Sequence, residues 1–183
     1  MSCKNNSKEL GIIGSSERIT IAGIENVPAK IDTGADSSSV WASHIRVTRD
    51  GILKFRLFDE GSPYYTGRTF EHKDFRAVVI RNSFGHEQVR YRTHLRIILG
   101  GRTIKVLCNL SDRSNNSFPV LIGRRTILHK FIVDVSKNHA KVRPKKPKTK
   151  LIQKQLAKDP YKFHEKYVKN NTKGNIKIEQ EGE

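Results

Sequence analysis

The segment from Ala29 to Val40 constrains this chain more than any other, because an apolar run is followed at once by an acid and a tight turn. The apolar run up to Ile31 predicts a strand, which places Asp32 at the strand's end. Thr33 and Gly34 then form the turn. Because glycine adopts backbone angles that other residues resist, we expect the chain to bend sharply just beyond the carboxylate. The segment would thus hold one carboxylate rigidly at the mouth of a sheet.

Short alternating segments elsewhere indicate an all-β fold. Ile52 to Phe58 alternates cleanly, and the two apolar runs that flank Gly100 and Gly101 predict a hairpin. Further strands are expected at 17–22, 27–31, 38–47, 77–80, 89–93, 119–123 and 131–135, and loops at 59–73, 81–87 and 109–117. Many short strands with Gly-rich turns favour a closed barrel or a sandwich.

Composition divides the chain into three parts. Residues 1–10 are expected to be a flexible leader, 11–140 a folded domain, and 141–183 a basic linker and tail that is partly helical or disordered. The tail carries 13 Lys and Arg against 5 Asp and Glu. Within it, Asp159 followed by Pro160 predicts a helix start, with the acid as cap and the proline in the first turn. From Asn170 onward we expect disorder.

The formal charge of +17 points to an acidic or polyanionic partner but says nothing about the fold. The two cysteines, Cys3 and Cys108, lie far apart, which argues against a disulfide framework or a thiolate zinc site. A buried structural role is expected for Cys108. No apolar run is long enough for a signal peptide or a membrane span, so we expect a cytoplasmic protein without a membrane partner.

The turn of Asp32, Thr33, Gly34 and Ala35 resembles the active-site turn of aspartic proteases, and of retropepsins in particular. In that family two such turns face each other, and their aspartates share a proton because neighbouring like charges cannot both ionise. The resemblance implies a retropepsin-like closed barrel with one short helix, and it makes Asp32 the candidate catalytic residue.

A second segment resembles the retropepsin floor, in which two apolar residues and a glycine pack beneath the catalytic turn. Here Leu121 and Ile122 are the apolar pair and Gly123 is the glycine, followed by a predicted short helix over 124–129. A buried carboxylate turn needs a floor that excludes water, and a glycine lets two backbones approach closely.

Two further matches complete the resemblance. Asp36 and Arg124 stand where retropepsins have an ion pair that braces the site, and an Arg fork suits a carboxylate. Asp36 could also contact the substrate backbone. The hairpin tip at Ser83, Phe84 and Gly85 stands where the family has its mobile flap, and a glycine there fits a lid that must bend.

The chain is most similar to a bacterial branch of this family whose members carry the name ATP-dependent zinc protease. One similar protein acts on glutamate tails of a small-subunit ribosomal protein. The shared segments are 30–35, 83–90 and 112–124, and the resemblance covers about 11–140. Two residues depart from the branch: Asp36 replaces a basic or small residue, and Trp41 replaces a histidine.

Other chemistries find less support in the sequence. His86 and Glu87 begin a zinc-helix pattern, but Arg90 stands where a second histidine is needed. No phosphate-binding loop is present, so we expect neither a metal nor another cofactor. Two plainer interpretations stay open, in which Asp32 is an ordinary turn carboxylate and Arg124 is a solvated cation.

The resemblance therefore implies an aspartic-type peptidase. With one catalytic turn per chain, a two-aspartate site requires a twofold homodimer, with Asp32 of each chain at the axis and Thr33 bonding across it. One aspartate would act as base on water while the other donates a proton. The substrate would be a peptide or protein, and the positive charge favours an acidic one.

The alternative is a catalytically silent retropepsin-like module that binds acidic protein or nucleic acid through its basic surface. Residues 141–183 could also contact RNA or the ribosome.

Overall fold

The computed structural model describes residues 9–81, 87–142 and 149–169. These fall into a β unit, which ends at 142, and a separate helical unit over 149–169. Most of the predicted leader, the flap tip at 82–86, the linker at 143–148 and the tail from 170 onward lie outside the described residues. The boundaries at 10 and 140 stay predictions.

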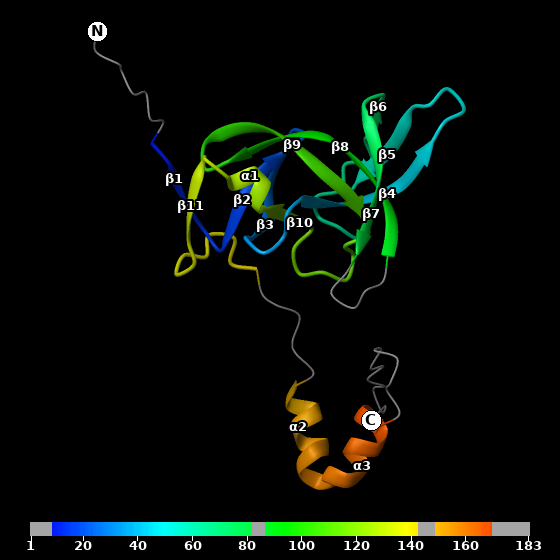
Figure 1. Ribbon diagram of the computed structural model, residues 1–183, viewed down its shortest axis with the longest axis vertical. Coiled ribbons are helices and arrows are strands. Elements are labelled where there is room, and N and C mark those ends of the chain that lie inside the picture. The colour runs from blue at the N-terminus through cyan, green and yellow to red at the C-terminus, as the bar shows by residue number, and fades with distance from the viewer. Residues whose placement is uncertain (1–8, 82–86, 143–148, 170–183) are drawn as a thin grey trace. The chain divides into compact units, whose positions relative to one another are not determined.

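The β unit is a closed barrel (Figure 1). Six strands follow one another around it in the order β10, β3, β2, β8, β9 and β4, and β4 pairs with β10 to close the ring. This confirms the predicted closed barrel. The strands are β1 (Gly11–Gly14), β2 (Ser16–Ile21), β3 (Ile24–Asp32), β4 (Ser38–Val47), β5 (Leu53–Leu57), β6 (Thr69–His72), β7 (Phe75–Arg81), β8 (Glu87–Leu99), β9 (Arg102–Ser111), β10 (Val120–Gly123) and β11 (Phe131–Asp134).

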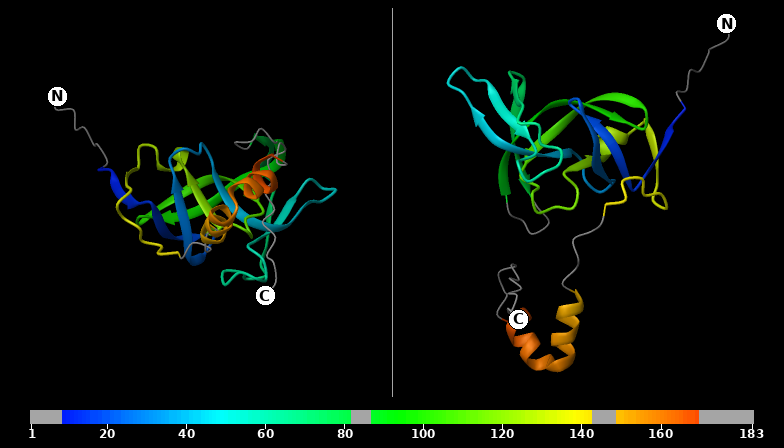
Figure 2. Two further views of the ribbon diagram at one scale, coloured as in Figure 1. Left: turned by 90° about the horizontal axis from the view of Figure 1, so that it is seen from below. Right: turned by 180° about the vertical axis from the view of Figure 1, so that it is seen from behind.

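The apolar core fills the barrel and continues beneath the hairpin of β4 and β5. This hairpin extends beyond the ring (Figure 2). Successive side chains along a strand point to opposite faces of the sheet, so every second side chain points into the barrel. In β8, for example, Leu95, Ile97 and Leu99 are buried while Ile98 between them is exposed. Under the hairpin, the rings of Phe55 and Phe70 stack with centroids 5.6 Å apart.

Two predicted loops contain strand residues. Within 59–73, β6 pairs with β5 because Phe70 stands opposite Phe55 and buries its ring there. Within 109–117, Asn109 and Ser111 are buried in β9, where they run parallel to β4. In both places long-range pairing overrides the polar composition that favoured a loop. The loop predictions were wrong there.

The predicted hairpin over 77–93 is larger than expected. It is formed by β7 paired with β8, and β8 is one strand of thirteen residues where two were expected. The tip that joins them lies outside the described residues.

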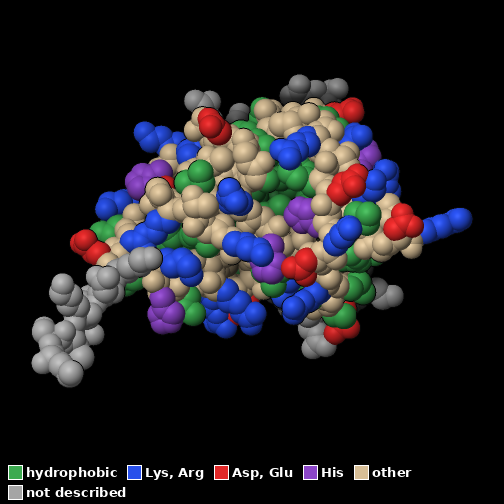
Figure 3. Space-filling view, turned by 90° about the horizontal axis from the view of Figure 1, so that it is seen from above, with side chains coloured by type: hydrophobic (Ala, Val, Ile, Leu, Met, Phe, Trp, Pro, Cys, Tyr) green, Lys and Arg blue, Asp and Glu red, His purple; other side chains and the backbone are tan. Residues whose placement is uncertain are grey.

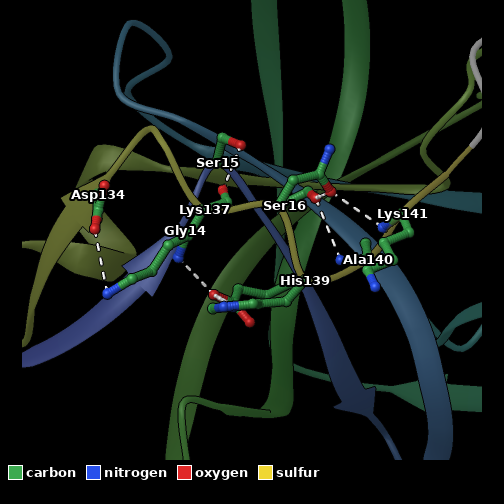
Figure 4. A network of polar contacts seen from close by, with 10 residues as sticks. Gly14, Ser15, Ser16, Asp134, Lys137, His139, Ala140 and Lys141 are labelled. Carbon is green, nitrogen blue, oxygen red and sulfur yellow. Dashed lines mark hydrogen bonds and ion pairs between the residues drawn. The ribbon is translucent and has the colours of Figure 1, made fainter.

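A network of polar contacts fastens the end of the β unit to its beginning (Figure 4). The buried Glu17 carboxylate accepts from the Gly14 amide at 2.5 Å and bonds His139 Nδ1 at 2.7 Å. The Ser16 hydroxyl donates to Asn138 Oδ1 at 2.5 Å. Ala140, at the end of this segment, is 1% exposed. The folded β unit therefore includes the residues that follow β11 up to about this point.

The helical unit contains α2 (Thr149–Lys158), α3 (Pro160–His164) and the π-helical turn η1 (Glu165–Lys169). Asp159 caps α3 by accepting from the Lys162 amide at 2.9 Å, and Pro160 follows it, which confirms the predicted helix start. The Tyr167 hydroxyl donates to Gln155 Oε1 at 2.9 Å and ties the helices together. None of the helices in the described part of the chain is long and apolar enough to cross a membrane.

Candidate active site

Asp32 is the last residue of β3, as the sequence predicts. The parallel neighbour β10 sets its position, with Ile122 opposite Ile31 and Gly123 opposite Asp32. Ile31 and Ile122 point into the core, so alternation directs the Asp32 side chain away from it. The carboxylate is half-buried at the barrel's end, while Thr33 beside it is exposed.

Backbone amides hold the Asp32 carboxylate in one orientation. Its Oδ1 accepts from the Gly34 amide at 3.1 Å and from the Ala35 amide at 3.2 Å. Such a bond from a side chain to amides two and three residues later itself forms a turn. The described bonds to this carboxylate use Oδ1, which leaves Oδ2 for a water or a second acid.

Gly34 differs from the expectation. Its φ lies outside the left-handed region, so the bend does not depend on glycine's backbone freedom, and that prediction was wrong. A Cβ at this position would lie 3.4 Å from Asp32 Oδ1, an ordinary van der Waals contact. The amide bonds to Asp32 account for the turn, and glycine leaves room beside the carboxylate.

Gly123 lies beneath the turn with almost no space around it. A Cβ there would lie 2.5 Å from the carbonyl carbon of Ser37, closer than real Cβ contacts come. The close backbone approach predicted for this glycine is therefore present. Ile122 beside it is fully buried and Leu121 is half-buried, so the three form the apolar floor of the site.

Two buried hydroxyls connect the turn to the floor. Ser38 Oγ accepts from the Gly123 amide at 3.1 Å and lies 2.8 Å from Thr126 Oγ1. Thr126 belongs to the short helix α1 (Arg124–Ile127). This link was not predicted from the sequence, although the run of serines after the turn was a signal for buried side-chain bonding.

Asp36 and Arg124 form an ion pair, as expected from the resemblance. Both side chains are more than half exposed, so water screens the attraction between them. The backbone supplies the firmer link: the Arg124 amide donates to the Ala35 carbonyl at 2.8 Å, and the Arg125 amide to the Asp36 carbonyl at 3.3 Å. The bracing role assigned to the side chains stays a prediction.

Arg113 is a charged neighbour of Asp32 that the sequence analysis did not select as a site residue. Its Nε donates to the Phe118 carbonyl at 3.1 Å. Burial lowers the pKa of Arg113 most, the positive charge of Arg90 lowers it further, and the Asp32 charge opposes both. The charges of Arg113 and Asp32 therefore act on each other, and a second arginine, Arg90, acts on Arg113. Both arginines belong to segments shared with the bacterial branch, which was the available signal.

The remaining candidates have structural surroundings. Trp41 is half-buried and packs edge-on against Phe58, with centroids 6.3 Å apart. Cys108 is fully buried, and burial raises the pKa of its thiol to about 12, which confirms the structural interpretation. The flap candidates Ser83, Phe84 and Gly85 lie outside the described residues. Among the residues that the structure describes, no cluster of three His, Cys, Asp or Glu could hold a metal.

Comparison with known families identifies the barrel. Residues 12–144 match the model of the family described as RimB-like, retropepsin-like aspartic endopeptidase RimB. The match includes the Asp32 turn, the floor and the short helix.

Comparison with single proteins gives two kinds of relative. The chain is 27% identical over 141 residues to a probable alpha-L-glutamate ligase from Shewanella pealeana, and 29% identical over 128 residues to one from Desulfotalea psychrophila. These alignments cover 69% and 67% of this chain but only 29% and 28% of the ligases. The chain thus spans less than a third of the length of these curated relatives.

One similar protein of known structure is shorter than this chain, and the similarity covers nearly all of it. It is the protein Lpg0085 of unknown function from Legionella pneumophila, similar with a TM-score of 0.57 and 26% identity. The similarity covers 72% of this chain and 98% of that protein.

Proposed function

Because the chain belongs to the RimB-like family of retropepsin-like aspartic endopeptidases, we propose that it hydrolyses peptide bonds with a water activated by two Asp32 carboxylates in a homodimer. The observation that carries the proposal is the orientation of Asp32. Two backbone amides fix its Oδ1, while Oδ2 is left for water or a second carboxylate.

In this proposal the second carboxylate comes from another copy of the chain. Among the described residues, Asp36 is the nearest acid along the chain, and it is paired with Arg124. A single acid cannot be base and proton donor in the same step. Two Asp32 carboxylates facing each other would share one proton, since both cannot be charged at close range.

The chemistry then follows from this shared proton. The ionised Asp32 takes a proton from water, whose oxygen attacks the carbonyl carbon of the peptide bond. The protonated Asp32 donates to the carbonyl oxygen. When the tetrahedral intermediate collapses, the amine leaves with the proton taken from water, and a hydroxyl of the intermediate returns a proton to the Asp32 that had donated one, so the pair again shares one proton and no covalent enzyme intermediate forms. The exposed Thr33 of each chain is free to bond across the axis.

An apolar surface supports the proposed dimer. β1 and β11 form a separate two-stranded sheet, in which Ile12 stands opposite Ile132. These side chains are 61% and 54% exposed, although a two-stranded sheet needs further burial to be stable. The sheet ends close to the catalytic strand, since the Ile31 amide donates to the Ser15 carbonyl at 3.0 Å. A second copy would cover this surface.

The arginines around Asp32 support an acidic peptide as substrate. Arg113 interacts electrostatically with Asp32 and is repelled by Arg90, and a carboxylate-bearing substrate would relieve the repulsion between the two arginines. The curated relatives are named for alpha-L-glutamate ligation, and a glutamate-containing peptide would supply such carboxylates.

The test is hydrolysis of acidic peptides by Asp32→Asn, with Asp50→Asn as the matched control on an exposed turn. Asparagine keeps the oxygen that accepts from Gly34 and Ala35, so the fold should persist. Removing the base should lower kcat by about 10³-fold or more, whereas the control should keep its activity. A statine-type transition-state mimic should inhibit the wild type. Unchanged hydrolysis by Asp32→Asn would end the proposal.

The silent module that binds acidic protein or nucleic acid remains the second candidate, because of the charge of +17. Such a module would ignore the inhibitor and release its partner steeply as salt rises. A contact of residues 141–183 with RNA or the ribosome also stays a prediction, tested by removing them and measuring cleavage and recruitment separately.

A further inference from the structure

Basic side chains are spread over the outer surface of the β8–β9 hairpin and the adjoining segment 125–130. The term "β8–β9 basic face" denotes Arg92, His94, Arg96, Lys105, Arg125 and Lys130. Figure 3 views the molecule from the side on which β8 and β9 lie, and blue side chains are spread across that surface with purple histidines among them. Two depressions of about 250 Å³ and 450 Å³ lie in it, both lined by His94 and Lys105.

Like charges stand directly opposite each other in this face. Arg96 on β8 is paired with Lys105 on β9, and both side chains are exposed. Like charges at directly opposed positions destabilise a sheet. The repulsion continues beside them, since burial and then the charge of Arg125 lower the pKa of Arg92. The fold therefore tolerates a repulsion between cations that a bound anion would relieve.

Few acids neutralise the face from within. Among residues 9–81, 87–142 and 149–169, the one ion pair that a member of the face forms joins His94 Nδ1 to Asp74 Oδ2, at 3.4 Å. Arg92 instead donates to neutral groups, Asn109 Oδ1 at 2.7 Å and Ser37 Oγ at 3.2 Å. The described side chains thus leave most of this charge for an external partner.

The arrangement fits two rows of phosphates. Arg92, His94 and Arg96 alternate along β8, so their Cα atoms follow one another at roughly 7 Å. Lys105, Arg125 and Lys130 come from other elements, and the smaller depression is lined by members of both groups. An extended acidic peptide presents one row of charges, whereas a nucleic-acid duplex presents two phosphate strands.

The neutral residues of the face favour duplex RNA over other nucleic acids. Among the described residues that line the two depressions, His94 carries the one aromatic ring, and it is paired with Asp74, so a row of unpaired bases would find no series of rings on which to stack. Thr20 and Thr103 flank Ile98 across three adjacent strands, β2, β8 and β9. Their hydroxyls can bond the 2′-hydroxyls that the wide minor groove of RNA displays.

We propose that the β8–β9 basic face is a docking site for the phosphate backbone of double-stranded RNA. Binding is independent of base sequence, because the contacts reach phosphates and sugars. The site does not use Asp32 and stands independently of the proposed hydrolysis. It would hold the enzyme on an RNA-containing assembly while the catalytic turn acts on protein.

The test measures binding of the full-length chain to a labelled RNA stem of about 20 base pairs, long enough to span successive grooves. Arg96→Gln with Lys105→Gln removes two charges from the face. Arg46→Gln with Arg49→Gln removes two from exposed positions on the β4–β5 hairpin and is the matched control. The face variant should bind about tenfold more weakly, and the slope of log affinity against log salt should fall by about two. The control should stay near wild type.

Further measurements keep the result interpretable. The face variant should unfold at the same temperature as wild type or higher, because the opposed charges are gone. Asp32→Asn should bind the stem as wild type does, which separates this site from catalysis. Equal loss in the face and control variants would overturn the proposal, as would no loss in either. Equal affinity for a DNA duplex, or tighter binding of single-stranded RNA or poly-L-glutamate, would also overturn the assignment to double-stranded RNA.

Discussion

The turn that carries Asp32 and the strand beneath it are held by different means. The turn is formed by its own short-range bonds, from the amides of Gly34 and Ala35 to the Asp32 carboxylate, and part of it is exposed. β10 is held by long-range contacts, with Ile122 fully buried and Gly123 against the backbone of Ser37. The candidate catalytic carboxylate thus lies on a locally formed turn, while the position of the turn depends on the packing of the barrel.

The two glycines illustrate the difference. Gly34 has room for a methyl group and an ordinary φ, whereas Gly123 has no room at all. Both belong to sequence motifs, yet only the second is demanded by packing. Substitutions in the turn should therefore change the stability little and lower the activity strongly. Substitutions in β10 should lower the stability strongly and affect the activity less.

The largest expected difference in stability is between these glycines. Gly123→Ala should lower the free energy of unfolding by about 3 kcal/mol, because its Cβ must displace the Ser37 backbone. Gly34→Ala should change it by less than about 1 kcal/mol, since the added methyl meets only an ordinary contact. Urea denaturation of both variants measures the two free energies of unfolding. Equal losses at the two positions would abolish the distinction between turn and floor.

A smaller effect is expected from the hydroxyl that links the two regions. Ser38→Ala leaves the Gly123 amide and the Thr126 hydroxyl without a buried partner, and should lower the free energy of unfolding by about 2 kcal/mol. Ser37→Ala is the control, because in the described part of the chain that half-buried hydroxyl accepts one bond, from Arg92. Thermal unfolding of both variants would measure this difference in stability. If Ser38→Ala unfolds like wild type, the hydroxyls do not connect turn and floor.

The smallest effect is expected from the exposed ion pair. Arg124→Gln and Asp36→Asn, measured singly and together, should give a coupling free energy below about 1 kcal/mol that fades as salt rises. The amide bond from Arg124 to the Ala35 carbonyl survives both changes. A larger, salt-independent coupling would show that the side chains themselves fasten the helix to the turn.

The structure could be predicted from the sequence wherever residues close together along the chain determine it. An apolar run ended by an acid and a small turn placed Asp32 at the end of β3, and Asp159 before Pro160 placed a helix start. The floor was found through its resemblance to the retropepsin motif. The resemblance also brought Asp36 and Arg124 together, which are far apart along the chain.

The predictions failed where pairing with a strand far away in the sequence determines the local structure. Asn109 and Ser111 are polar and looked like a loop, yet pairing with β4 buries them. Phe70 lies among polar residues, and only its stacking on Phe55 shows why a strand forms. The proximity of Arg113 to the charge of Asp32 likewise depends on barrel closure, which no local pattern reveals.

Subunit mixing is the most direct test of a catalytic site shared between two chains. Wild type and Asp32→Asn would be unfolded together, refolded at known ratios and assayed for peptide hydrolysis. A site that needs Asp32 from both chains predicts activity that falls with the square of the wild-type fraction, to about a quarter at equal amounts. Activity that falls in simple proportion, to about a half, would show that each chain is catalytically complete and would contradict the shared site.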